Sequence, residues 1–254
     1  QGETMSDRKI LVMLPTYNER ENVQKMCREL SRIDIPADIL FVDDNSPDGT
    51  GDVLDGLSKK VPHLLVMHRS GKLGIGSAHK DGIARAYLHG YTHLVTMDCD
   101  FTHCPKDIPD LLQCADEYDV VVGSRHMHRD SLSGWNLWRK FVTKTGHVLT
   151  TVLLKMPYDA TGAFRLYRLD RIPPEVFGSV SSNGYSFFIE SLEILNLNRF
   201  RIQEIPIALP PRTYGHSKLQ FRDMVQWLTF MLGMAWNIRF HRKKFLIARA
   251  ESRP

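Results

Sequence analysis

Two acidic residues separated by a single position follow a short apolar run, residues 93–97. The run has the composition of a buried strand, and Asp98-Cys99-Asp100 comes directly after it. Side chains two positions apart on an extended chain project from the same face, so Asp98 and Asp100 can hold one hard cation between them. Oxygen ligands suit Mg²⁺ or Mn²⁺, which keep several waters and bind substrate phosphates. Acidic turns are also common after strands without a metal, but ligands of open α/β sheets bind at this end of a strand, which favours a metal site that neutralises a departing diphosphate.

A run of glycines with one lysine follows the third expected strand, at Ser70-Gly71-Lys72-Leu73-Gly74-Ile75-Gly76-Ser77. It lacks the Lys and Ser or Thr that follow the last glycine of a Walker A loop, and His79 stands where a dinucleotide fingerprint needs its third glycine. Two interpretations remain. The glycines form a turn that begins the next helix, or Lys72 and backbone amides there approach a nucleotide.

Length and composition are those of an ordinary globular protein. The chain has 254 residues, of which 43% are hydrophobic and 24% are charged, enough for one large or two small domains. Its four cysteines form no Cys-x-x-Cys pair, which indicates free thiols in a reducing compartment. The net charge is +4, but residues 239–254 alone carry six Lys or Arg against one acid. A nucleic-acid domain would be basic throughout, whereas a basic tail beside an apolar helix indicates anionic lipid.

Apolar runs and helical periodicities alternate through the first half of the chain. Strands are expected at residues 9–14, 38–42, 63–68, 93–97 and 119–122, and helices at 19–33, 50–60, 74–89 and 106–117. Thr50, after a dense cluster of turn residues, is expected to cap its helix. The alternation predicts an α/β fold, a Rossmann-like open and mostly parallel sheet with helices on both faces.

In the second half of the chain, the spacing of apolar residues predicts helices at residues 135–154, 186–197 and 221–240. It predicts extended segments at residues 163–167 and 202–209. We expect one domain over residues 6–220, with halves 6–123 and 124–220, followed by a C-terminal unit of residues 221–254. The uncharged run 224–238 is short for crossing a bilayer. Its aromatic residues and the basic residues after it suit an amphipathic helix lying in a membrane interface. The alternative is an ordinary helix packed on the domain.

Five motifs occur in the order that is typical of one family. They are Pro15-Thr16-Tyr17-Asn18-Glu19, Asp43-Asp44-Asn45-Ser46-Pro47-Asp48-Gly49-Thr50, Asp98-Cys99-Asp100, Gly123-Ser124-Arg125 and Arg212-Thr213-Tyr214-Gly215-His216-Ser217-Lys218. With them the chain resembles the inverting GT-A glycosyltransferases, and among these the dolichyl-phosphate (polyprenyl-phosphate) mannose synthases, from about residue 10 to residue 219. Each motif alone is a weak signal, whereas the ordered set is specific.

The resemblance implies a pocket for a nucleotide sugar and a pair of carboxylates that bind one metal ion. The contacts to the nucleotide sugar would come from Pro15, Tyr17, Glu19, Val42, Asp44, Lys72, Asp98, Cys99, Asp100, Arg125, Arg212 and Lys218. In this set Asp44 would accept a hydrogen bond from the base or the ribose, and Asp98 and Asp100 would hold Mg²⁺ or Mn²⁺ on the diphosphate. Thr102 stands where many relatives carry Gln or Ser as a further ligand, which leaves a third protein ligand in doubt.

Basic residues are the second set that the resemblance implies. The catalytic residues would be Asp100, Arg125, Arg139, Arg212 and Lys218, and the acceptor phosphate would be bound by Ser124, Arg125 and Arg139. Arginine suits phosphates because its guanidinium makes bidentate contacts. The alternative for any one of these residues is a surface ion pair, which contributes little stability. The loop that contains Arg212 and Lys218 would close over bound substrate.

The implied reaction joins GDP-mannose and a polyprenyl (dolichyl-type) monophosphate to give polyprenyl phosphate β-D-mannose and GDP, with inversion and a divalent metal. The second pKa of a phosphate is about 6, so the acceptor oxygen is already charged and needs no strong base. Glu190 or Asp159 would serve as a base only for a hydroxyl acceptor, and we expect both to be structural or loop-ordering residues first.

Two alternatives stay open from the sequence. The donor could instead be UDP-glucose or another UDP-sugar, or the chain could be an inactive scaffold recruited to a membrane. Expected partners are GDP-mannose, a polyprenyl monophosphate and an anionic membrane surface, with a membrane-anchoring protein left open and nucleic acid not expected. The expected location is peripheral, on the cytoplasmic face of the plasma membrane or the endoplasmic reticulum.

Overall fold

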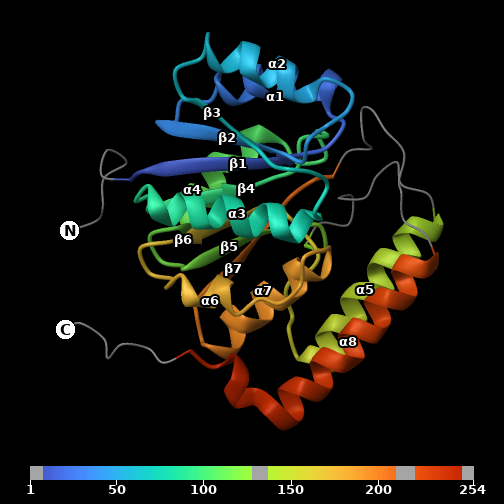
Figure 1. Cartoon of the computed structure of the whole chain (residues 1–254). Coiled ribbons are helices and arrows are strands. Elements are labelled where there is room, and N and C mark those ends of the chain that lie inside the picture. The colour runs from blue at the N-terminus through green and yellow to red at the C-terminus, as the bar shows by residue number, and fades with distance from the viewer. Residues whose placement is uncertain (1–7, 128–136, 210–220, 248–254) are drawn as a thin grey trace.

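The computed structural model describes residues 8–127, 137–209 and 221–247, without the side chains of residues 137–142 and 221–227. Within these residues seven strands form one sheet in the order β3-β2-β1-β4-β6-β5-β7 (Figure 1). They are β1 Ile10–Thr16, β2 Ala37–Asp43, β3 Leu64–His68, β4 His93–Thr96, β5 Val120–Ser124, β6 Arg165–Arg168 and β7 Ile202–Pro206. Only β6 is antiparallel to its neighbours, β4 and β5, so the predicted open and mostly parallel sheet is confirmed.

All the predicted helices are present close to their expected positions, and the short helix α6 was not predicted. They are α1 Arg20–Leu30, α2 Thr50–Ser58, α3 Ile75–Leu88, α4 Ile108–Cys114, α5 Leu137–Leu154, α6 Glu175–Gly178, α7 Ser186–Leu197 and α8 Phe221–His241, with 3₁₀ helices η2 Pro105–Asp107 and η3 Arg242–Phe245. The prediction that Thr50 caps α2 is wrong, because Gly49 precedes the helix in a left-handed conformation. Asp48 Oδ1 instead accepts hydrogen bonds from both the hydroxyl and the backbone N–H of Thr50, at 2.6 and 3.0 Å.

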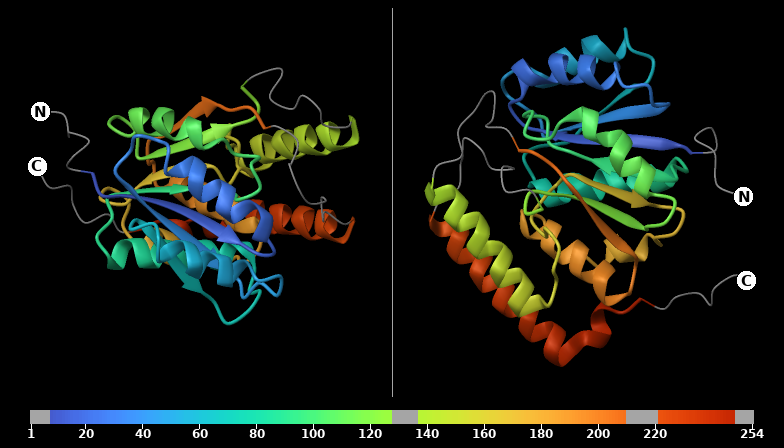
Figure 2. Two further views of the ribbon diagram at one scale, coloured as in Figure 1. Left: turned by 90° about the horizontal axis from the view of Figure 1, so that it is seen from above. Right: turned by 180° about the vertical axis from the view of Figure 1, so that it is seen from behind.

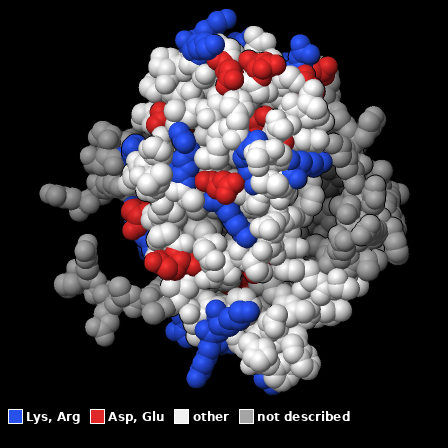
Figure 3. Space-filling model, in the orientation of Figure 1, with Lys and Arg blue, Asp and Glu red and all other residues white. Residues whose placement is uncertain are grey.

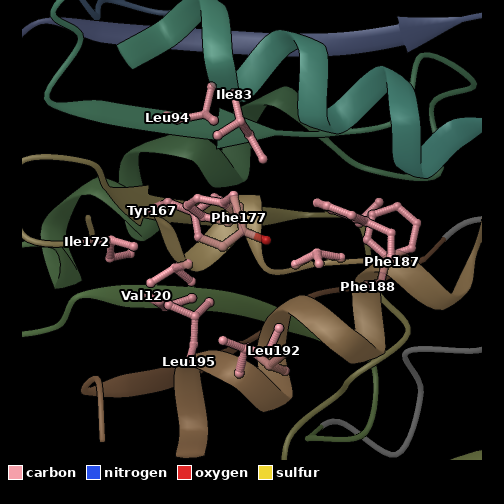
Figure 4. Close-up of a cluster of buried hydrophobic side chains, with 14 of the residues drawn as sticks. Ile83, Leu94, Val120, Tyr167, Ile172, Phe177, Phe187, Phe188, Leu192 and Leu195 are labelled. Atoms are coloured by element: carbon pink, nitrogen blue, oxygen red, sulfur yellow. The ribbon is translucent and has the colours of Figure 1, made fainter. Parts of the chain in front are cut away.

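The side chains of β1 alternate between two hydrophobic cores. Leu11 and Met13 point to the face covered by α3, α6, α7 and α8, whereas Ile10, Val12 and Leu14 point to the face covered by α1, α2 and α4. Successive side chains of a strand lie on opposite faces, so a strand buried on both faces must be apolar at every position. Figure 4 shows the first core, between α3, the sheet, α6 and α7. Each large apolar side chain that is fully buried contributes about 1.5–3 kcal/mol.

Helices α5 and α8 lie side by side, and both begin on the side of the molecule where the parallel strands end (Figures 1 and 2). Met231 and Met234 of α8 are buried, whereas Leu232, Trp236 and Phe240 are 52%, 62% and 56% exposed. The predicted C-terminal helix therefore packs along one side and presents apolar residues on another. None of the helices in the described ranges is both long and apolar enough to cross a membrane. The division of the chain at residue 220 stays a prediction.

Glu193 of α7 is a buried carboxyl group, and burial raises its pKa to about 7. This folded-state pKa lies above that of an unfolded glutamate, about 4.3, so the cost of ionising Glu193 is absent below about pH 4 and grows as the pH rises to 7. We expect Glu193→Gln to raise the free energy of unfolding by on the order of 1–2 kcal/mol at pH 8 and to change it little at pH 4. Urea denaturation at the two pH values measures this difference. Glu175→Gln, at an exposed position of α6, is the control, and an equal gain at both pH values would contradict the prediction.

Candidate active site at the carboxyl edge of the sheet

The carboxyl ends of β1, β2, β4 and β5 meet at one edge of the sheet (Figure 1). The strand register pairs Pro15 with Val42 and Met13 with Thr96, so the turns that follow β1, β2 and β4 are neighbours. These turns carry the motifs that the sequence analysis selected. Ligands of open α/β sheets bind at this edge, because the chain leaves the sheet there and opens a crevice.

The turns after β1 and β2 are joined by hydrogen bonds. The backbone N–H of Asn18 donates to Ser46 Oγ, and that of Glu19 donates to Thr50 Oγ1, both at 3.0 Å. Asn18 and Asn45 have φ angles of 59° and 54°, a left-handed conformation that asparagine adopts more easily than most residues. The two motifs that were predicted to bind a nucleotide therefore form one ordered corner.

Asp44, in this corner, is buried and forms an ion pair with Arg69. Arg69 also donates to Asp81 Oδ2 at 2.9 Å and to Ser77. Arg69 was not predicted as a site residue, although it directly follows the expected strand 63–68. Because β2 and β3 are parallel and Asp43 pairs with His68, Arg69 follows β3 at the level where Asp44 follows β2. Arg69 therefore fixes a carboxylate that was predicted to contact the base or the ribose.

Lys72 lies over the ring of Tyr17, with Nζ 4.1 Å from the ring centroid, a cation–π contact. The glycine-containing turn thus lies beside the turn after β1, and the approach of Lys72 to a nucleotide stays a prediction. The interpretation of the glycines as a turn that begins the next helix is confirmed, because Gly74, with φ of 99°, precedes α3 directly. A Cβ on Gly76 would lie 2.7 Å from the carbonyl oxygen of Gly184. Val42 is fully buried in the first hydrophobic core, and its contact with a nucleotide stays a prediction.

Asp98 and Asp100 lie in the turn after β4. Asp100 is 8% exposed, and its Oδ1 accepts hydrogen bonds from the backbone N–H and the hydroxyl of Thr102, at 3.1 and 2.6 Å. Thr102 therefore orients the Asp100 carboxylate. Burial, together with the acids around it, raises the pKa of the Cys99 thiol, which disfavours a thiolate ligand.

The donor set of this turn fits a hard divalent cation. In the described part of the chain no three His, Cys, Asp or Glu side chains converge as a metal cluster. A cation held by Asp98 and Asp100 would have ligand positions left for water and for substrate phosphates. Mg²⁺ and Mn²⁺ bind in this way.

Arg125 follows β5 and is held by Asp159. Arg125 donates to Asp159 Oδ2 from its Nε at 2.8 Å and from its backbone N–H at 3.2 Å. Burial alone would raise the pKa of Asp159, but Arg125 and His126 lower it to about 2, so the carboxylate is ionised. The backbone N–H of Asp159 donates to Glu204 Oε1 at 2.7 Å. These contacts give Asp159 a structural role, as predicted.

The residues on either side of Arg125 support this turn. Ser124 is fully buried, and its hydroxyl accepts from the backbone N–H of His126 at 3.3 Å and hydrogen-bonds with Glu204. A contact between Ser124 and an acceptor phosphate stays a prediction. The His126 ring stacks on that of His147 in α5, with 4.0 Å between the centroids, and burial lowers the pKa of His126 to about 4. This stacked pair, which was not predicted from the sequence, ties the Arg125 turn to α5.

Glu190, the second acid considered as a base, orders a loop. Its carboxylate accepts from the backbone N–H groups of Ser181 and Ser182 at 3.0 and 2.8 Å and from the Ser181 hydroxyl at 2.8 Å. This loop contacts the start of α3, where the backbone N–H of Ser77 donates to the Asn183 carbonyl oxygen at 3.1 Å. The prediction that Glu190 is first a loop-ordering residue is confirmed.

Three residues of the predicted basic set lie outside what the structure describes. Arg139 is in the first turn of α5, and its side chain is among those not described. Arg212 and Lys218 fall within residues 210–220, which are not described. Arg125 is thus the member of the set whose contacts are known. The catalytic and phosphate-binding roles of all four residues stay predictions.

Comparisons with solved structures identify the fold. A mannosyl-3-phosphoglycerate synthase from Rubrobacter xylanophilus superposes with a TM-score of 0.61 at 17% identity, covering 97% of this chain and 79% of that one. The mannosyltransferase PcManGT from Pyrobaculum calidifontis, solved in complex with GDP-Man and Mn²⁺, superposes with a TM-score of 0.50 at 18% identity, covering 83% of this chain and 60% of that one. At these identities the likeness is one of fold.

Sequence comparisons identify the family. An undecaprenyl-phosphate mannosyltransferase from Micrococcus luteus is 34% identical over 83% of this chain and 87% of its own length. A polyprenol monophosphomannose synthase from Mycolicibacterium smegmatis is 36% identical over 82% of this chain and 80% of its own length. The profile of glycosyl transferase family 2 matches residues 11–172, which include Arg125 and the turns after β1, β2 and β4. This chain is a glycosyltransferase and belongs to glycosyl transferase family 2.

Proposed function

We propose that this chain transfers mannose from GDP-mannose to a polyprenyl monophosphate with inversion, which gives polyprenyl phosphate β-D-mannose and GDP. One observation carries the proposal. Asp98, Asp100 and Arg125 follow strands that end at one sheet edge, in a chain 34–36% identical to an undecaprenyl-phosphate mannosyltransferase and a polyprenol monophosphomannose synthase over more than four fifths of its length.

The residues of the edge have separate tasks in this proposal. Tyr17 and Lys72 border the space for the base, and Arg125 neutralises phosphate charge. The acceptor phosphate, with a second pKa of about 6, is already a nucleophile at neutral pH. A base is not required, which agrees with the hydrogen bonds that occupy Asp159 and Glu190. The protein mainly aligns two anionic groups and masks their repulsion.

Asp98 and Asp100 would hold Mg²⁺ or Mn²⁺. A divalent cation there, when bound, supplies positive charge to the diphosphate as it leaves. Thr102 would act through Asp100, because its hydroxyl donates to that carboxylate. The complex of PcManGT with GDP-Man and Mn²⁺ supports a divalent cation in this fold.

A transfer assay tests the function. Radiolabelled mannose should pass from GDP-mannose into an organic-extractable lipid when polyprenyl phosphate and Mg²⁺ or Mn²⁺ are present, and EDTA should stop the transfer. Thermal shifts with GDP, UDP and their sugars rank the donors, because a ligand that binds only the folded state raises its melting temperature. Stronger stabilisation by UDP would replace GDP-mannose with a UDP-sugar. Absence of nucleotide and metal binding would leave the inactive scaffold.

The exposed side of α8 supports a membrane surface as a partner. Leu232, Trp236 and Phe240 recur at intervals of four residues and are more than half exposed. The surface over the described part of α8 is largely uncharged in Figure 3. Exposed Arg and Lys follow at residues 242–244. An apolar stripe followed by cations suits a helix that lies in an anionic interface, which we place on the cytoplasmic face of a plasma or endoplasmic reticulum membrane.

Replacing Trp236 and Phe240 by Ser tests this surface. Their rings pack against each other with centroids 4.3 Å apart, and both are more than half exposed, so little folding energy depends on them. We expect the double variant to bind vesicles that contain anionic lipid at least about tenfold more weakly, because it no longer buries two aromatic side chains in the interface. Sedimentation with vesicles measures the binding. Leu88→Ser, at an 81% exposed position of α3, should bind like the unchanged protein, and equal binding of all three would refute the proposal.

Arg125→Ala tests the assignment of the acceptor phosphate. A charge-assisted hydrogen bond contributes about 1.5–3 kcal/mol, so transfer should slow roughly ten- to more than a hundredfold. GDP affinity without lipid should change little. The variant also leaves Asp159 without its partner, so rates are compared only at temperatures where it is folded. If GDP no longer binds in the absence of lipid, Arg125 belongs to the donor diphosphate instead.

A further inference from the structure

The turn that carries Asp98 and Asp100 is closed by a histidine that the proposed reaction does not use. The backbone N–H of Asp98 donates to Nδ1 of His103 at 2.9 Å. His103 is 3% exposed. Between them Phe101 adopts φ of 62°, a left-handed conformation that costs a bulky residue on the order of 1 kcal/mol or more. A strained turn of this kind persists only when neighbouring contacts hold it in place.

The His103 ring is anchored to the sheet. It stacks on Phe164, with 5.2 Å between the centroids and 15° between the planes. Phe164 is fully buried, directly precedes β6 and accepts the backbone N–H of Gly123 at its carbonyl oxygen, at 2.9 Å. His103 therefore connects the turn after β4 to the strand that lies between β4 and β5.

The hydrogen bond defines the state of the ring. Nδ1 accepts the Asp98 N–H, so the proton of the neutral ring is on Nε2. Each acid of the pair is thus held by a different residue. Thr102 binds the Asp100 carboxylate, and His103 binds the Asp98 peptide.

We propose that His103 is a positioning residue that fixes the Asp98 peptide, so that the carboxylates of Asp98 and Asp100 meet a divalent cation together. The inference rests on the proposed function, because it assumes that this pair binds the cation of the donor complex. Its prediction is that removing the Nδ1 acceptor weakens cation binding, whereas removing the ring and keeping an acceptor does not.

Two variants of nearly equal shape separate these effects. His103→Asn and His103→Leu both lose the stack on Phe164, but only Asn has an oxygen that can accept the Asp98 N–H. Mn²⁺ affinity in the presence of GDP is measured by the electron paramagnetic resonance signal of free Mn²⁺, at temperatures where both variants are folded. We expect the Leu variant to bind Mn²⁺ about five- to tenfold more weakly than the unchanged protein, and the Asn variant within about threefold of it.

His93→Leu is the matched control. His93 is fully buried at the other end of the same strand, β4, and its Nε2 has no hydrogen-bond partner within the described residues. Its replacement should leave Mn²⁺ affinity unchanged even if it alters stability. If His103→Leu does not fold, His103→Phe, which keeps a ring beside Phe164, replaces it in the comparison with Asn.

The outcomes are distinct. If His103→Asn binds Mn²⁺ with the same affinity as His103→Leu, or as His103→Phe where that variant replaces it, the positioning role is overturned. A difference in urea stability without a difference in Mn²⁺ affinity also overturns it, because His103 is then only structural. If the unchanged protein with GDP binds no Mn²⁺, the proposed function fails at its metal site, and the inference fails with it for that separate reason.

Discussion

Asp100→Asn is expected to reduce mannosyl transfer by two to three orders of magnitude without unfolding the protein. Asn is isosteric with Asp, and its carbonyl oxygen can still accept both hydrogen bonds from Thr102, so the turn is preserved. The substitution removes the negative charge that would hold a cation on the leaving diphosphate. Losing one preorganised electrostatic contact of a transition state costs about a hundred- to a thousandfold in rate.

Initial rates over a range of Mn²⁺ concentrations measure this effect. The variant should need more Mn²⁺ for half-maximal rate and should remain slow at saturation. Asp110→Asn changes an exposed acid of α4 after the same turn and should behave like the unchanged protein. If the transfer rates of Asp100→Asn and Asp110→Asn differ by less than about threefold, Asp100 is not a catalytic residue.

Arg69→Met is expected to lower the free energy of unfolding by about 3–5 kcal/mol, because it leaves the Asp44 carboxylate buried without its cation. Asp81 and Ser77 would lose hydrogen bonds at the same time. The nucleotide corner should loosen with them, so GDP should stabilise the variant less than it stabilises the unchanged protein. Urea denaturation with and without GDP measures both effects.

The double variant Arg69→Met/Asp44→Asn should recover part of the lost stability, since no buried charge is left unpaired. Arg32→Met supplies the control, because Arg32 is exposed and pairs with a partly exposed Glu29, and such pairs contribute at most about 1 kcal/mol. A loss from Arg69→Met no larger than that from Arg32→Met would show that the Asp44 ion pair is not a main support of the corner.

The sequence by itself determined the elements and the edge at which the site lies. Apolar runs and helical spacing are local properties, so residues 9–14 and 38–42 were predicted as strands within two residues of β1 and β2. Motifs placed directly after such strands lie at the carboxyl edge in any parallel sheet, so Asp98, Asp100 and Arg125 could be selected without a structure. The ordered motifs also identified the family that the sequence comparisons later showed.

Tertiary structure alone decided which side chains meet. Arg69 reaches Asp44, Asp159 reaches Arg125 and His103 reaches Phe164 across separations that local periodicity does not encode. Two of these contacts depend on β6, which enters the sheet antiparallel between β4 and β5 and brings residues 159–164 to the carboxyl edge. The direction and order of strands follow from the packing of the whole core, whereas residues 163–167 read alone indicate only an extended segment. For the same reason the sequence indicated an amphipathic α8, and the packing of α8 decided which of its apolar residues are buried and which are exposed.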